Sequence, residues 1–243
     1  MLFARSLAFN LGLGSWTLLL VIAALPLLAA RRERMIALGR LWQRGVQALL
    51  AGIAGLTYEV RGREHMPARP AIYAFKHQSA WETLVLNLLF RDLAIVLKRE
   101  LTQIPLFGWY LRHAGMIGID RTGGARALRT LVDDGRAALA RGSSIVIFPE
   151  GTRAPVGERN PYHPGVAALY RQLECPVVPV ALNSGLFWRR RGFIKRPGRI
   201  VVEFLPPIAP GLERKAFMAE LEQRLERATD RLIAEGRPAP LAA

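Results

Sequence analysis

A histidine and a glutamate separated by four residues are the first candidates for chemistry in this sequence. His77 and Glu82 follow a short apolar run at residues 71–75, so both fall where a buried strand gives way to a loop, a common position for catalytic groups. A neutral imidazole accepts a proton near neutral pH, and a nearby carboxylate can orient it. The pair therefore predicts general-base chemistry, although the spacing alone is equally compatible with a structural histidine packed in a loop.

A second group of polar residues follows another apolar run, at residues 144–148. Its members are Glu150, Gly151, Thr152 and Arg153. Glycine lets a backbone approach a ligand closely, and the Thr152 hydroxyl and Arg153 guanidinium are donors that suit phosphate. The segment predicts an anion-binding loop, with a tight turn carrying an exposed ion pair as the structural alternative.

Three other segments carry weaker signals. Arg121 follows the apolar run 116–119 after one residue and is well placed to meet an anion. An Asp–Arg pair in a turn is nevertheless the favoured interpretation of this segment alone. Pro179 lies inside the run 177–182, which predicts a strand with a polar exit. The segment 188–196 places arginines beside aromatic residues, which suits docking of a headgroup or an anionic donor; a solvated loop is the alternative.

The charge balance limits the class of partner. The 34 basic and 19 acidic residues give a formal net charge of +15, and nearly all the basic residues are arginine. This excess favours a membrane surface, an acidic protein or nucleic acid, although a base composition rich in arginine codons would produce the same bias. The lone Cys175 excludes an internal disulfide. No Cys/His grouping has metal-ligand spacing, so we expect no metal in the chemistry.

The N-terminal segment predicts a membrane anchor. No charged residue occurs at positions 6–30, and about 20 apolar residues suffice to cross a bilayer as a helix. The arginines at 31–34 favour a retained anchor over a cleaved signal peptide and place the rest of the chain in the cytoplasm. Pro26 is expected to kink the helix. The stretch 45–58 predicts an interfacial or re-entrant helix, which leaves one span and a two-helix hairpin both open.

The remaining pattern alternates short apolar runs with helical periodicity, which indicates an α/β fold with a mostly buried sheet of about seven strands flanked by helices. The expected strands are 57–60, 71–75, 93–97, 116–119, 144–148, 177–182 and 199–204. The expected helices are 81–90, 106–113, 124–141, 165–172 and 214–234. The simplest division is a membrane-associated segment at 1–57, one catalytic domain at 58–235 and a flexible tail at 236–243.

Taken in order, the four segments around His77, Arg121, Glu150 and Pro179 resemble the four motifs of the membrane-associated glycerolipid acyltransferases. The closest resemblance is to the bacterial 1-acyl-glycerol-3-phosphate acyltransferases, over about residues 62–205. Order, approximate spacing and flanking elements agree, including Lys98, Arg99, Glu100, Leu101, Pro105 and Gly108. The resemblance implies a single acyltransferase domain.

The resemblance also assigns expected roles. His77 is the general base, and Glu82 stands where the family most often has aspartate. Arg121 matches the second-motif arginine. The acceptor-phosphate motif matches Glu150, Gly151, Thr152 and Arg153. Pro179 matches the proline linked to the acyl-binding region.

The implied reaction transfers an acyl chain from acyl-CoA or acyl carrier protein to the sn-2 hydroxyl of 1-acyl-glycerol-3-phosphate, giving phosphatidic acid. Backbone N–H groups near His77 or Ser79 are expected to stabilise the oxyanion. No cofactor, covalent intermediate or nucleic acid is expected. The expected location is the inner membrane, at its anionic cytoplasmic surface. Another lysolipid acceptor such as lyso-ornithine lipid is the close alternative, and a non-catalytic basic membrane or nucleic-acid binder is the alternative from another class.

Overall fold

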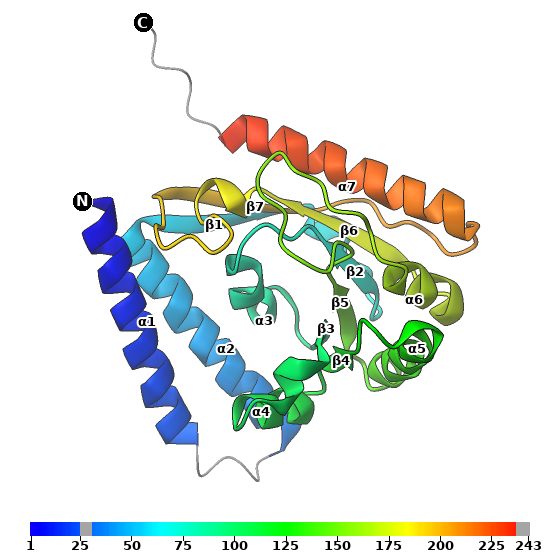
Figure 1. Ribbon diagram of the computed structural model, residues 1–243, viewed down its shortest axis with the longest axis horizontal. Coiled ribbons are helices and arrows are strands. Elements are labelled where there is room, and N and C mark those ends of the chain that lie inside the picture. Colours follow the sequence, from blue (N-terminus) through cyan, green and yellow to red (C-terminus); the bar gives the residue numbers. More distant parts are fainter. Residues whose placement is uncertain (25–30, 237–243) are drawn as a thin grey trace, which may run out of the picture.

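A mixed sheet forms the centre of the computed structural model, which describes residues 1–24 and 31–236 (Figure 1). Within these residues the sheet has seven strands in the order β1-β7-β6-β2-β5-β3-β4. Neighbouring strands are parallel except β6 and β7, which are antiparallel. The strands are β1 (Leu56–Arg61), β2 (Ile72–Phe75), β3 (Leu93–Lys98), β4 (Ile117–Ile119), β5 (Ser144–Ile147), β6 (Val177–Leu182) and β7 (Gly198–Phe204).

Each strand lies within one residue of its predicted bounds, and the predicted α/β fold is confirmed. Every residue of β2 and β6 is buried, because helices cover both faces of the sheet. This burial explains why both strands appear in the sequence as continuous apolar runs rather than as alternating patterns.

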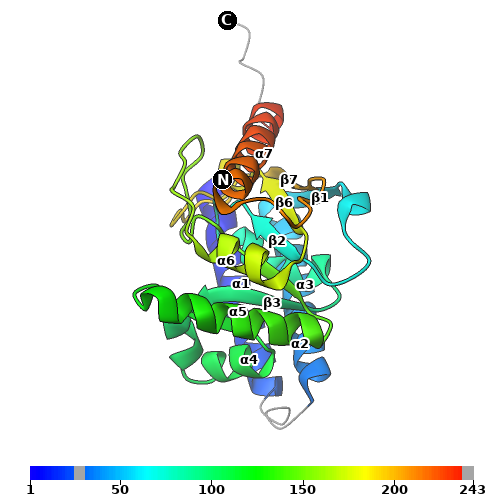
Figure 2. The same ribbon diagram turned by 90° about the vertical axis from the view of Figure 1, so that its right-hand side faces the viewer.

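Helices α5 (Gly124–Ala140), α6 (Gly165–Leu173) and α7 (Arg214–Gly236) lie on one face of the sheet. Helices α2 (Arg32–Leu49) and α3 (Leu86–Leu89) lie on the other face, and the side view in Figure 2 shows the same two layers. Helix α4 (Phe107–His113) packs near the sheet edge at β4. The predicted helix at 81–90 is wrong as one element. It is a 3₁₀ turn (Trp81–Leu84) followed by α3, because Val85 leaves the helical region at φ −128°.

Two long helices precede the sheet. Helix α1 (Leu2–Ala24) lies beside α2 (Arg32–Leu49), which continues as a π-helical turn (Leu50–Ala54) and ends at Gly55 in the left-handed region. The expected interfacial helix at 45–58 is therefore the end of a longer helix, and residues 56–58 belong to β1. The expected kink at Pro26 lies outside the described residues.

Helix α2 is bound to the domain by specific contacts. Gln43 Nε2 donates to the Thr83 carbonyl at 3.1 Å, and Gln47 Nε2 donates to the Leu84 carbonyl at 2.9 Å. Val46 belongs to the same apolar core as the sheet. The division at residue 57 stays a prediction, and this packing joins the helix to the sheet across it. Of the expected tail, Gly236 ends α7, and residues 237–243 lie outside the described part.

Within residues 1–24 and 31–236, α1 alone is long and apolar enough to span a membrane, over Leu2–Ala23. Its large apolar side chains are mostly exposed on the protein surface: Leu2, Phe3, Leu7, Leu11, Leu18, Leu19, Val21 and Ile22. Exposed apolar side chains gathered on one helix indicate a surface that contacts another apolar phase.

Candidate active site

His77 lies at the carboxyl end of β2, in the middle of the sheet, where parallel α/β folds place their ligands. Its ring stacks on Phe148 with centroids 4.1 Å apart. The backbone N–H of His77 donates to Glu150 Oε2 at 3.2 Å, and the His77 carbonyl accepts the Ala154 N–H at 2.8 Å. The loop after β5 therefore holds both sides of the His77 backbone. The buried Nδ1 of His77 has no hydrogen-bond partner among the described residues.

Burial and neighbouring positive charge keep His77 neutral. Burial contributes most to lowering its pKa to about 3, and the charges of Arg153, Arg121 and Arg190 lower the pKa further. At pH 7 the imidazole is therefore unprotonated, which is the form that a general base requires.

Glu82 is buried and organises the loop instead of hydrogen-bonding the His77 ring. Its Oε1 accepts the N–H groups of Gln78 at 2.7 Å and Ser79 at 2.9 Å, and the Ser184 hydroxyl at 2.9 Å. Burial raises the pKa of Glu82, and these donors partly offset the rise. The structure thus gives the carboxylate a role that the sequence spacing did not predict: it joins the loop after β2 to the loop after β6.

Two of the backbone N–H groups in the region expected to stabilise the oxyanion, those of His77 and Ser79, already have partners in this structure, and the oxyanion donors stay a prediction. The N–H of His77 already donates to Glu150, and the N–H of Ser79 donates to both Glu82 oxygens, at 2.9 and 3.1 Å. Burying a donor without a partner is costly, so these bonds are retained unless the loop rearranges.

Of the predicted anion-binding residues, Arg121, Gly151, Thr152 and Arg153 line one cavity together with His77. Gly151 has φ +63°, and a Cβ there would lie 2.7 Å from the His163 ring and 3.5 Å from the Arg121 guanidinium carbon. Glycine adopts this left-handed backbone without strain and leaves the His163 ring in place, whereas a Cβ at this position would displace that ring. Arg153 has a buried Nε with no partner in the described part of the chain.

Two arginines from the basic segment 188–196, Arg190 and Arg191, also line the cavity. Arg190 reaches Thr152 Oγ1 at 3.5 Å and lines the same cavity. Together with Arg121 and Arg153 it makes a positively charged surface next to a neutral imidazole. Arginine forks suit phosphate oxygens, so the arrangement can hold a phosphate beside a base.

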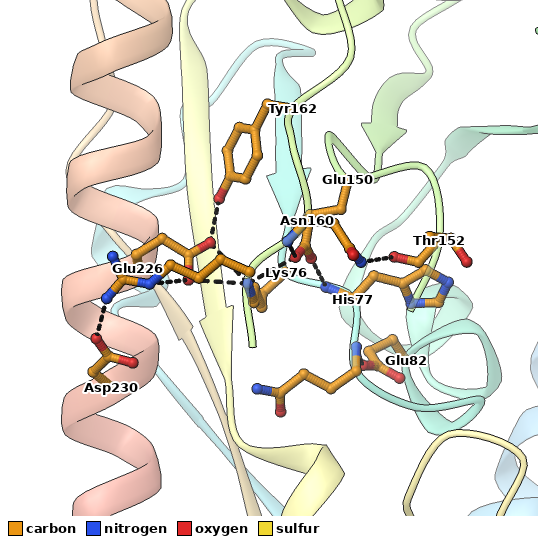
Figure 3. Close-up of polar contacts among 11 residues, drawn as sticks. Lys76, His77, Glu82, Glu150, Thr152, Asn160, Tyr162, Glu226 and Asp230 are labelled. Carbon is orange, nitrogen blue, oxygen red and sulfur yellow. Dashed lines mark hydrogen bonds and ion pairs between the residues drawn. The ribbon is translucent and has the colours of Figure 1, made fainter. Parts of the chain in front are cut away.

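Glu150 and Pro179 lie away from this surface. The Glu150 carboxylate faces inward, bonded to Lys76 and the His77 N–H, and burial raises its pKa (Figure 3). Pro179 is buried in β6 opposite Ala74. Its carbonyl accepts the Leu205 N–H beyond the end of β7, where a missing proline N–H breaks no bond of the β6–β7 ladder. Neither residue lines the cavity.

A cavity of about 1040 Å³ connects the polar surface to the N-terminal helices. His77, Arg121 and Arg153 line its polar part. Apolar side chains line the rest, including Leu20 and Val21 of α1, Leu38 and Trp42 of α2, and Phe107 of α4. A long apolar cavity with a few convergent polar groups suits an amphiphile with one charged end.

Proteins of known name are similar to this chain in sequence. The chain is 41% identical to the 1-acyl-sn-glycerol-3-phosphate acyltransferase of Pseudomonas aeruginosa over 197 residues, which are 81% of this chain and 77% of that protein. It is 34% identical over 175 residues to the protein of the same name from Limnanthes alba, covering 71% of this chain and 62% of the plant protein.

A solved structure shares the fold. The crystal structure of the 1-acyl-sn-glycerophosphate acyltransferase PlsC from Thermotoga maritima aligns with a TM-score of 0.75 and 19% identity, covering 96% of this chain and 99% of that one. The family model described as Acyltransferase matches residues 57–183, which contain all four sequence motifs. This match and the identity to the bacterial protein confirm the resemblance seen in the motifs, and the chain belongs to the Acyltransferase family.

Proposed function

We propose that the protein transfers an acyl group from a thioester to the free hydroxyl of 1-acyl-glycerol-3-phosphate, with His77 as the general base. The observation that carries the proposal is the position of a neutral imidazole between a surface of three arginines and a large apolar cavity. The names of the bacterial and plant relatives support the same acceptor.

The proposed chemistry is direct transfer. His77 accepts the hydroxyl proton as the oxygen attacks the thioester carbonyl. The tetrahedral intermediate collapses by breaking the carbon–sulfur bond, and the leaving thiolate takes the proton from His77. General-base assistance of this kind contributes about 10² to 10⁴ in rate. The acyl group and the proton are both accounted for in these steps, so the reaction needs neither a cofactor nor a covalent enzyme intermediate.

Acceptor binding strengthens the base in this scheme. The charges of Arg121, Arg153 and Arg190 depress the pKa of His77. A phosphate held among these arginines offsets their charge, so the pKa of His77 rises when the acceptor binds. A phosphate-bearing acceptor therefore gains both affinity and a better base, and an acceptor without phosphate gains neither.

The membrane is the proposed location of the reaction. Acceptor and product are amphiphiles, and the cavity extends from His77 to α1, whose outer face exposes large apolar side chains. We place α1 in the inner membrane and the sheet domain on its cytoplasmic side, where the exposed arginines at 189–191 meet anionic headgroups. Acyl-CoA and acyl carrier protein both carry phosphate and remain the two proposed donors.

The test is acyl transfer by membranes that contain the full chain, with two acceptors and two donors. Lysophosphatidic acid and lyso-ornithine lipid are each supplied with acyl-CoA or acyl carrier protein. Phosphatidic acid formed with either donor supports the proposal, and the faster donor identifies the thioester. If product forms only from lyso-ornithine lipid, that lipid replaces lysophosphatidic acid as the proposed acceptor, and the proposed transfer mechanism stands. No transfer by well-folded protein to either acceptor would contradict the proposed function.

A further inference from the structure

Three buried charged side chains lie behind the His77 loop, and the proposed chemistry does not use them. The side chains of Lys76 and Glu150 are 1% and 0% exposed, and that of Glu226 is 5% exposed. Glu226 lies on α7, beyond the residues matched by the family model. Motif reasoning missed Lys76 and Glu226, since neither belongs to a recognisable pattern in one sequence.

These groups form a continuous chain of hydrogen bonds from α7 to the peptide of His77 (Figure 3). Lys76 Nζ donates to Glu226 Oε1 at 2.7 Å and Oε2 at 3.0 Å, and to Glu150 Oε1 at 2.8 Å. The other oxygen of Glu150 accepts the His77 N–H. The ammonium thus directs all three of its protons to carboxylates and fixes one carboxylate against the backbone of the base.

Two further contacts hold the α7 end of this chain. The Tyr162 hydroxyl donates to Glu226 Oε1 at 2.8 Å, and Arg159 Nε lies 3.7 Å from Glu226 Oε2. Both residues come from the loop that follows the Glu150 motif, and the neighbouring Asn160 N–H reaches Glu150 Oε1 at 3.3 Å. Glu226 therefore holds the same loop from two directions.

Burying a cluster of charges is expensive, and apolar residues of similar volume often give equal or greater stability. The specific result of this cluster is orientation. Its bonds fix the peptide that carries the base, and a displacement of about 1 Å at a reacting group can cost about 10²-fold in rate.

We propose that Lys76 and Glu226 are positioning residues for the acyl transfer, acting through Glu150 to hold His77 in its reactive place. Glu226 then makes a positioning contact from helix α7, which contributes no group to the cavity. This inference rests on the proposed role of His77 as the base.

The deciding experiment measures kcat and KM per mole of folded enzyme for Glu226→Gln and Lys76→Met in the full chain. We expect kcat to fall about 10- to 100-fold in each variant. KM for lysophosphatidic acid should change less than about threefold, because the loss falls on the transition state rather than on acceptor binding. In the double variant the losses should not multiply, because Glu226 acts through Lys76.

Two controls separate positioning from stability. Glu220→Gln breaks an exposed pair with Arg224 on the same helix, and Leu221→Ala removes buried packing from α7 and leaves the network intact. Both should keep kcat per folded molecule, even where Leu221→Ala lowers the melting temperature. If Lys76→Met does not fold, Glu226→Gln and Tyr162→Phe, which retain the side-chain shapes, decide the question.

The positioning role of Lys76 and Glu226 and the general-base role of His77 fail on different results. The positioning role would be overturned if Glu226→Gln keeps the wild-type kcat and a second folded variant, Lys76→Met or Tyr162→Phe, keeps it too. If His77→Ala is inactive in the same experiment, the proposed base stands. Activity retained in His77→Ala would instead remove the proposed base. A loss of kcat in the network variants with an inactive His77→Ala supports both.

Discussion

Replacing Arg153 tests how the site recognises its acceptor. The guanidinium lines the cavity, and its buried Nε has no partner among the described residues. A hydrogen bond to a charged group contributes about 1.5–3 kcal/mol. Because about 1.4 kcal/mol corresponds to a factor of ten, Arg153→Ala should lower kcat/KM for lysophosphatidic acid about 10- to 150-fold.

The assay compares lysophosphatidic acid with monoacylglycerol, which has the same acyl chain and a free hydroxyl but no phosphate. Arg153→Ala should leave the rate with monoacylglycerol unchanged or slightly higher, since removing a positive charge raises the pKa of His77. Arg171→Ala is the matched control, because Arg171 is exposed on α6 and does not line the cavity. Equal losses with both acceptors, in a variant that melts like wild type, would refute phosphate recognition by Arg153.

Three other substitutions test separate parts of the structure. Because the pKa of His77 is about 3 when folded and about 6.5 when unfolded, wild type loses stability as the pH falls from 6.5 toward 3. Between pH 6 and pH 4, the free energy of unfolding should therefore fall by about 2–3 kcal/mol less in His77→Gln than in wild type, as measured by thermal unfolding. An identical fall in both proteins would contradict the buried neutral imidazole. Glu82→Asp shortens a carboxylate that accepts backbone N–H groups and the Ser184 hydroxyl, so unfolding free energy should fall by about 1–3 kcal/mol, seen as a lower melting temperature; an unchanged melting temperature would contradict this. Gly39 and Tyr110 both line the cavity, and a Cβ at Gly39 would overlap the Tyr110 hydroxyl. Gly39→Ala should therefore reduce transfer of long acyl chains relative to short ones when the two thioesters compete. An unchanged ratio of the two products would argue against an acyl chain in this part of the cavity.

The sheet was predictable because its strands are buried on both faces. Runs such as 144–147 and 177–182 are short, apolar and bounded by turn residues, so their bounds follow from composition alone. The segment 81–90 was not predictable in the same way. Its apolar spacing suits a helix, but the segment begins with a 3₁₀ turn in which Glu82 accepts the N–H groups of Gln78 and Ser79 and, from a distant loop, the Ser184 hydroxyl.

The site was predictable to the extent that its residues follow strands. His77 and Arg153 follow the carboxyl ends of the neighbouring strands β2 and β5, and Arg121 follows β4, two strands from β5. Because these strands are parallel, all three residues lie at the same edge of the sheet. The inward direction of the Glu150 side chain was not predictable, because it depends on Lys76 and on a glutamate 76 positions later on α7. Buried partners at such separation leave no local pattern in one sequence.

The most direct test of the account is the acyl-transfer rate of His77→Ala beside wild type, in membranes supplied with lysophosphatidic acid and an acyl thioester. Wild type should form phosphatidic acid, and the variant should form it about 10²- to 10⁴-fold more slowly at equal amounts of folded protein. Transfer at the wild-type rate by folded His77→Ala would contradict the claim that this imidazole is the base.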